Sequence, residues 1–222
     1  MIRERLGHME RAAMTCGQLG VLAEENERAA EAEGWYRRAL ELEKQAYPRK
    51  TTYALYLHNL ASLLVREVQM GRAPMNRLIE ARGYAEQAQA IQETQAVSAN
   101  TWKTFSILVD IAEKEGRTEA ARDYRRRERE TYIAFEGNHH SIDRQFGELI
   151  AIIASAAQGN KQAREATERF LQQLEAELKT QPMIEAIRRL LRGERDRHSL
   201  TENLGGRDAL LLLRMLEELQ KQ

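Results

Sequence analysis

Cysteine is almost absent from this sequence, which has one among its 222 residues. A single cysteine excludes an intrachain disulfide framework and any zinc site built on cysteines. Ala13, Leu19 and Gly20 are near neighbours of this residue, Cys16, in the chain. Such a setting favours a small core residue, which is the more common role of a free cysteine.

Net charge is absent as well, because Lys plus Arg and Asp plus Glu both number 34. Proteins that bind nucleic acid normally carry a basic excess, and a neutral chain has no evident attraction to an acidic membrane surface. No apolar run approaches the roughly 20 residues of a membrane span. The segment Met1–Glu10 is charged and lacks the apolar core of a signal peptide. We therefore expect a cytoplasmic protein that binds neither nucleic acid nor membrane.

Residues that break helices are scarce, with 3 prolines and 13 glycines. Charged residues make up 31% of the chain and hydrophobic residues 42%. A mixture rich in Ala, Glu, Leu and Arg favours long helices over strands. The length is enough for one large domain or for a continuous stack of helices.

Four residues that favour chain reversals occur at regular intervals. Asn26, Gly71, Gly116 and Gly159 stand 45, 45 and 43 residues apart, and each lies between two amphipathic stretches. Asn and Gly enter the left-handed backbone region most cheaply, which a sharp reversal between helices often needs. The spacing therefore predicts four copies of a helix–turn–helix unit.

The apolar pattern predicts an all-α chain of four helix pairs followed by two further helices. The expected pairs are 10–25 with 27–46, 51–70 with 74–94, 97–115 with 117–135, and 142–157 with 160–179. A polar connection is expected at Glu136–Ser141. A short helix at 182–192, a polar stretch at Gly193–Asn203 and a last helix at 207–220 follow.

The last helix is apolar nearly all round in its first half, which contains four consecutive leucines from Leu210 to Leu213. A helix of this kind should be covered on both sides. Terminal repeats need a modified outer face, so one interpretation is a C-terminal cap. The other is self-association or domain docking through 207–220, since large apolar patches often mark interfaces.

The first pair resembles the tetratricopeptide repeat family. Its signature is a large–small couplet in the first helix of a repeat and then Ala, an aromatic residue and Ala in the second. Leu19 and Gly20 match the couplet, and Ala32, Tyr36 and Ala39 match the second helix. The later pairs match less closely, and the period of about 44 exceeds the usual 34, as in the extended repeats of kinesin light chain.

This resemblance implies a right-handed superhelical stack of about four helical hairpins. The array would occupy residues 1–180, with approximate repeats 10–48, 51–94, 97–135 and 142–179, and the helical cap would occupy 181–222. The function that it implies is protein–protein interaction, with a protein or peptide partner bound in the concave groove of the array.

Two segments, 16–25 and 35–40, are similar to repeats in bacterial signalling proteins that carry an NB-ARC nucleotide-binding domain or a caspase-like CHAT domain. The alternative function is therefore a ligand- or peptide-sensing domain of a larger bacterial signalling protein. No phosphate loop of the Gly-x4-Gly-Lys-Ser/Thr type occurs in the sequence. A nucleotide-dependent switch would have to be on another chain or segment.

In the tetratricopeptide family, the first helices of successive repeats line the groove. The groove-facing residues implied for this chain are Gln18, Val21, Glu25, His58, Asn59, Ser62, Arg66, Lys103, Ser106 and Asp110. Trp102, Phe105 and His58 are candidate binding anchors. Polar groups at this spacing can bond a peptide backbone, although they can equally be the solvated side of a helix.

The chaperone-binding members of the family hold a terminal carboxylate with a clamp of five residues. Asn59 and Lys103 match two clamp positions, whereas Gly17, Val21 and Ile107 stand at the other three. With only two of the five clamp residues, the sequence lacks most of the charge-assisted hydrogen bonds that hold a carboxylate, so a chaperone-tail clamp is not predicted.

Reactive groups are few. His139 and His140, with Glu136 and Asp143, make the only cluster that suggests a metal, but no HExxH motif supports it. A metal-dependent enzyme is the remote alternative, and a solvated loop is the favoured interpretation. Asp123, Glu128 and Glu130 lie within and beside the arginine run at 125–129, which favours a charged helix face over a phosphate site. We expect no enzyme activity, no catalytic residue and no cofactor.

Overall fold

The computed structural model describes residues 2–46, 51–94, 99–177 and 181–221. In this part of the chain it contains eleven helices and no strands, which confirms the all-α prediction. Within the same ranges, no helix is both long enough and apolar enough to cross a membrane.

The chain divides into two compact units, Met1–Arg125 and Arg126–Gln222. The division falls inside α6 (Thr118–Ala134). This structural division differs from the expected boundary at residue 180. The assignment of 1–180 to a repeat array and of 181–222 to a cap stays a prediction.

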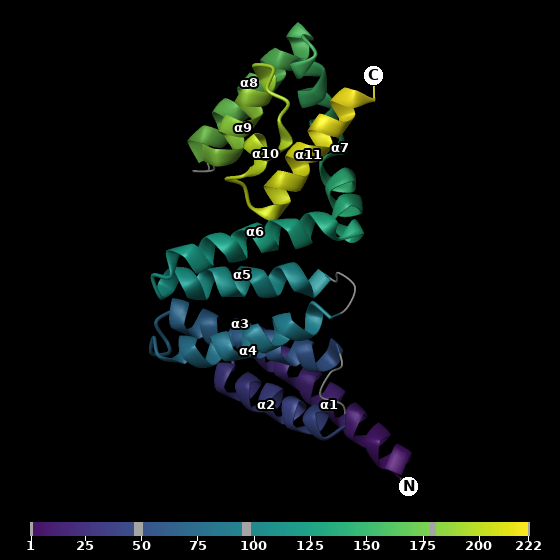
Figure 1. The fold of residues 1–222 in the computed structure, drawn as a ribbon, viewed down its shortest axis with the longest axis vertical. Coiled ribbons are helices and arrows are strands. Elements are labelled where there is room, and N and C mark those ends of the chain that lie inside the picture. Colours follow the sequence, from purple (N-terminus) through teal and green to yellow (C-terminus); the bar gives the residue numbers. More distant parts are fainter. Residues whose placement is uncertain (1, 47–50, 95–98, 178–180, 222) are drawn as a thin grey trace. The chain divides into compact units, whose positions relative to one another are not determined.

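The first unit is built from pairs of antiparallel helices. They are α1 (Ile2–Glu25), α2 (Ala29–Ala46), α3 (Thr51–Gln69), α4 (Arg77–Gln92), α5 (Ala99–Lys114) and the first part of α6. α1 packs on α2 and α3 packs on α4, as Figure 1 shows in purple and blue. α3 also contacts α2 and α5, and α4 contacts α5. α3 is therefore the central helix of this unit.

Small residues allow the close approach of α1 and α2. Ala32 and Ala39 are fully buried, and the ring of Tyr36, only 1% exposed, lies between them in sequence. A Cβ atom on Gly20 would lie 2.5 Å from Cε1 of Tyr36, so only glycine fits beneath this ring. The three residues of α2 that match the repeat signature are thus all buried.

The predicted left-handed turns are confirmed at three of the four positions. Gly71 and Gly116 have φ of 70°, and Gly159 has φ of 101°. At the first reversal the prediction is wrong, because Glu27, with φ of 57°, takes this conformation in place of Asn26. The side-chain Nδ2 of Asn26 instead donates to the carbonyl of Leu22 over 2.6 Å. Asn26 thus closes the end of α1, and the reversal follows one residue later.

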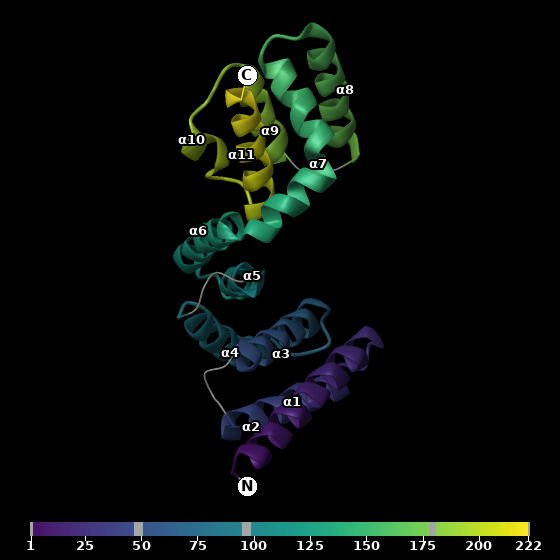
Figure 2. The same cartoon turned by 90° about the vertical axis from the view of Figure 1, so that its right-hand side faces the viewer.

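The second unit is organised around α7. It contains the end of α6, α7 (Glu136–Ala157), α8 (Lys161–Glu177), α9 (Gln181–Leu191), α10 (Arg197–Thr201) and α11 (Gly206–Gln220). α7 contacts α8, α9 and α11, and these four helices lie close together in Figure 2. The predicted pair α7–α8 is therefore present, but the last helix packs on α7 as well.

The polar connection expected at Glu136–Ser141 is wrong because this segment is helical, and part of the expected polar stretch at Gly193–Asn203 is also helical. Glu136–Ser141 is the first part of α7, and 197–201 forms α10. Asp196 caps α10, because its Oδ1 accepts a hydrogen bond from the amide of Ser199 over 2.7 Å. Charged and polar residues dominate both segments, and such residues form helices when a cap or a neighbouring helix satisfies the helix end.

The leucines of α11 are buried within the second unit. Leu210, Leu211 and Leu212 are at most 8% exposed, as are Met215 and Leu216. Gly205 is the N-cap and α11 begins at Gly206, one residue before the expected start at 207. The apolar surface that suggested self-association through 207–220 is thus largely covered by the chain's own helices. Self-association through this helix stays a prediction.

Candidate functional site

A hollow of about 370 Å³ opens at the surface of the first unit. It is lined by side chains from α1, α2 and α3: Val21, Glu24, Glu25, Tyr36, His58, Asn59, Ser62 and Arg66. All four α3 residues predicted as groove-facing are among them, together with two of the three predicted on α1. The α3 residues recur at helical spacing, so one face of that helix forms a wall of the hollow.

Glu24 joins the three walls through two hydrogen bonds. Its Oε1 accepts from Nη1 of Arg66 over 2.7 Å, and its Oε2 accepts from the hydroxyl of Tyr36 over 2.8 Å. Burial raises the pKa of Tyr36 well above its usual value, and the adjacent Glu24 carboxylate raises it further. The phenol therefore stays neutral and donates, while Arg66 supplies the opposing charge to Glu24.

Glu24 and Tyr36 are site residues that the sequence interpretation missed. Tyr36 enters the sequence prediction only as the aromatic residue of the repeat signature, whereas in the structure it also lines the hollow and its hydroxyl bonds to Glu24. Glu24 is one of many glutamates in the chain. No sequence signal distinguishes it, because its partner Arg66 lies 42 residues away.

His58 connects the hollow to α5. Its Nδ1 lies 3.0 Å from Oγ1 of Thr104, within hydrogen-bonding distance. Burial, and to a smaller extent the positive charge of Lys103, lower the pKa of His58 to about 4. The imidazole is therefore neutral at pH 7 and contributes hydrogen bonding but no charge.

The residues predicted on α5 do not line this hollow. Ser106 is exposed, and Nζ of Lys103 lies 5.6 Å from the centre of the half-buried Trp102 ring. Asp110 accepts a hydrogen bond from Nε2 of Gln69 over 3.1 Å, which ties α5 to α3. These α5 residues therefore lie outside the lining of the hollow.

Phe105, predicted as a binding anchor, is buried in the core. It is 1% exposed, and its ring centre lies 6.4 Å from that of Tyr124 on α6. A side chain with no exposed surface offers no contact to a partner, so Phe105 is a core residue and not a groove anchor. Its position in the apolar stripe of α5 explains the burial.

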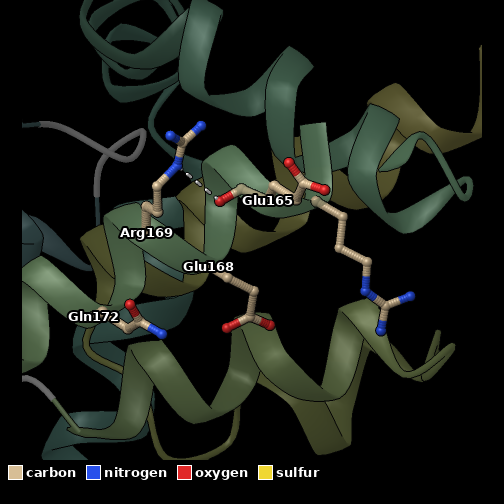
Figure 3. A pocket seen from close by; sticks show the side chains of 5 residues that line it. Glu165, Glu168, Arg169 and Gln172 are labelled. Atoms are coloured by element: carbon tan, nitrogen blue, oxygen red, sulfur yellow. Dashed lines mark hydrogen bonds between the residues drawn. The ribbon is translucent and has the colours of Figure 1, made fainter. Parts of the chain in front are cut away.

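A second hollow, of about 360 Å³, lies on the surface of the second unit. Its lining comes entirely from α8: Arg164, Glu165, Glu168, Arg169 and Gln172 (Figure 3). Nε of Arg169 lies 3.4 Å from the backbone carbonyl of Glu165, as the dashed line marks. Two arginines and two glutamates balance in charge on a single helix. This hollow lacks the convergence of several helices that distinguishes the first.

The histidine pair lies on α7. Nε2 of His139 lies 2.6 Å from the carbonyl oxygen of Ile133, so one ring nitrogen already has a backbone partner. His140 is exposed, and its Nε2 is 3.9 Å from Oε1 of Glu136. The expected solvated loop is thus a helix, and the two rings have different surroundings.

The neutral state of His58 makes stability depend on pH. An unfolded His58 binds a proton below about pH 6.5, whereas the folded residue binds one only below about pH 4. Between these values the unfolded state takes up the proton, so the free energy of unfolding decreases as the pH falls. We expect His58 to contribute about 2–3 kcal/mol to the loss of stability between pH 7 and pH 4.

Urea unfolding of the wild type and of His58→Gln at a series of pH values measures this contribution. Glutamine does not titrate, so the variant should lose less stability at low pH. The exposed His198→Gln variant is the control and should follow the wild type. Parallel pH profiles of His58→Gln and the wild type would contradict the assignment.

Comparisons with known proteins found no matching family model and no curated protein of significant similarity. The resemblance to tetratricopeptide repeats is therefore carried by the residues quoted above. The candidate site depends on the geometry of this chain.

Proposed function

We propose that this chain is a protein-interaction module of the tetratricopeptide type, which binds a peptide segment of a partner protein in the hollow of the first unit. The observation that carries the proposal is that residues of two helices converge on the same hollow. Residues predicted as groove-facing on two helices line one hollow: Val21, Glu25, His58, Asn59, Ser62 and Arg66.

The polar groups of the hollow suit a peptide backbone. The amide of Asn59 and the hydroxyl of Ser62 make no hydrogen bond to other side chains within the described residues. Both groups can donate and accept, as can the N–H and C=O groups of an extended peptide. The Glu24–Arg66 pair and the bond between Glu24 and Tyr36 hold the walls in place before a ligand arrives. A preformed site loses less entropy on binding.

The sensing alternative uses the same hollow. In a larger bacterial signalling protein, occupation of the hollow by a peptide would be transmitted to an attached domain. A cytoplasmic location and the absence of a catalytic role are parts of both proposals. The interaction and sensing proposals differ in whether a further domain is attached to the chain, and not in how the hollow binds a peptide.

Peptide selection tests the proposal. A phage-displayed peptide library is selected on the whole chain, and the affinity of synthetic copies is measured by fluorescence anisotropy. We expect Ser62→Trp and Val21→Trp, which fill the hollow from two different helices, to weaken binding at least about tenfold by steric exclusion. Gln87→Trp on the exposed side of α4 is the matched control and should bind normally.

Circular dichroism and thermal unfolding establish that the variants are folded. Val21 is 42% exposed, so a tryptophan there is tolerated even if Ser62→Trp perturbs α3. A library that yields no specific peptide, or peptides that bind both hollow variants like the wild type, would refute the proposed function.

A further inference from the structure

The charges around the hollow identify what kind of peptide it suits. Glu24 is paired with Arg66, so these two groups cancel. Burial and the Glu24 carboxylate raise the pKa of Tyr36, and burial lowers the pKa of His58, so both are neutral at pH 7. One uncompensated charge is left in the lining, the carboxylate of Glu25.

Glu25 is exposed at the last position of α1. In the described part of the chain, it makes no hydrogen bond or ion pair. Besides Arg66, Lys103 on α5 carries a positive charge near His58. Its Nζ lies over the Trp102 ring, and Lys103 does not line the hollow. The internal charges therefore leave the carboxylate of Glu25 available for a ligand.

An apolar strip continues from this carboxylate along α1. Met14 and Val21 are 51% and 42% exposed, unusually high for large hydrophobic side chains. With Gln18 and Glu25 they follow a spacing of four, three and four residues, which places all of them on one face of the helix. This face offers apolar contact beside a negative charge.

We propose that the hollow takes a basic peptide segment, with a Lys or Arg side chain against Glu25 and an apolar side chain over Val21 and Met14. This inference rests on the proposed function and names the class of its partner. Charge complementarity favours a basic peptide, because a cationic side chain beside Glu25 neutralises the only unpaired charge among the lining residues. The peptide backbone then bonds to Asn59 and Ser62.

An octapeptide array tests this inference. The labelled 222-residue protein is applied to peptides in which each position in turn is Lys, Arg, Gln, Asp or Leu. We expect selection for Lys or Arg at one position and for an apolar residue near it. Glu25→Gln should weaken the Lys and Arg peptides by roughly three- to tenfold, the range of a charge-assisted contact at a partly exposed site. The matching Gln peptides should bind both proteins equally.

Glu148→Gln, an exposed substitution on α7, changes the net charge equally and should have no effect. High salt should reduce the preference in the wild type and not in Glu25→Gln. Selection of acidic peptides, or equal effects of the Glu25 and Glu148 substitutions, would overturn the basic-peptide inference while peptide binding itself stands. Failure of every peptide to bind would overturn the proposed function and this inference with it.

Discussion

Replacing Gly20 by valine is expected to lower the free energy of unfolding of the first unit by about 3 kcal/mol, since overpacking a tight contact costs about 1–3 kcal/mol or more. A Cβ at this position would lie 2.5 Å from Cε1 and 2.6 Å from Cδ1 of Tyr36. The ring cannot move aside easily, because it is 1% exposed and its hydroxyl is bonded to Glu24. α1 and α2 must therefore separate.

The matched control is Gly34→Val on α2, where an added Cβ meets nothing within 4 Å. Valine is a better helix former than glycine by a few tenths of a kcal/mol, so this variant should be as stable as the wild type or slightly more so. Urea unfolding followed by circular dichroism and tryptophan fluorescence measures both. Both tryptophans, Trp35 and Trp102, lie in the first unit, so fluorescence reports on that unit.

Displacement of Tyr36 should also disturb the hollow, because this ring is part of its lining. We therefore expect folded Gly20→Val protein to bind selected peptides less tightly, and Gly34→Val to bind like the wild type. Equal stability of the two variants would show that α1 and α2 do not approach as closely as Gly20 and Tyr36 require.

Leu212→Ala is expected to destabilise the second unit by about 3 kcal/mol, within the 2–5 kcal/mol range for large-to-small changes in a packed core. Leu212 is fully buried on α11, and α11 packs on α7. Truncation removes three carbons and leaves a cavity that the rigid helices around it can fill only in part. α7 also supports α8 and α9, so the loss should affect the whole unit.

Leu213→Ala is the control, because the next leucine along the helix is half-buried and should lose about 1 kcal/mol or less. Hydrogen exchange of the α7 and α11 peptides, measured by mass spectrometry, reports on this unit directly. We expect faster exchange in Leu212→Ala only. Similar effects of the two substitutions would contradict the orientation of α11.

The same pair of variants separates the two interpretations of the last helix. If α11 is a cap, sedimentation velocity should give the same oligomeric state for Leu213→Ala as for the wild type. If its leucines mediate self-association, the half-buried Leu213 is within reach of another molecule. A change of oligomeric state on its substitution would then be seen without a loss of fold.

Much of the candidate site follows from local pattern. His58, Asn59, Ser62 and Arg66 share one face of α3 because of their helical spacing, and the hydrophobic residues of that helix occupy the other faces. Phe105 was misassigned because a helix pattern states which residues are apolar but not how far each is covered. Glu24 could not be predicted as a site residue from the sequence, because its role depends on Arg66 and Tyr36, which belong to other helices.

The amino-acid sequence by itself determined the helical class, the small residues between helices and the left-handed turns at Gly71, Gly116 and Gly159. These features depend on the backbone preferences and spacing of nearby residues, which each segment carries with it. Only the tertiary structure decided that Glu24 bonds to Arg66, that α11 packs on α7 and that Phe105 is covered by Tyr124. Such contacts depend on the rotation and offset of whole helices, which are set by the packing of many side chains together.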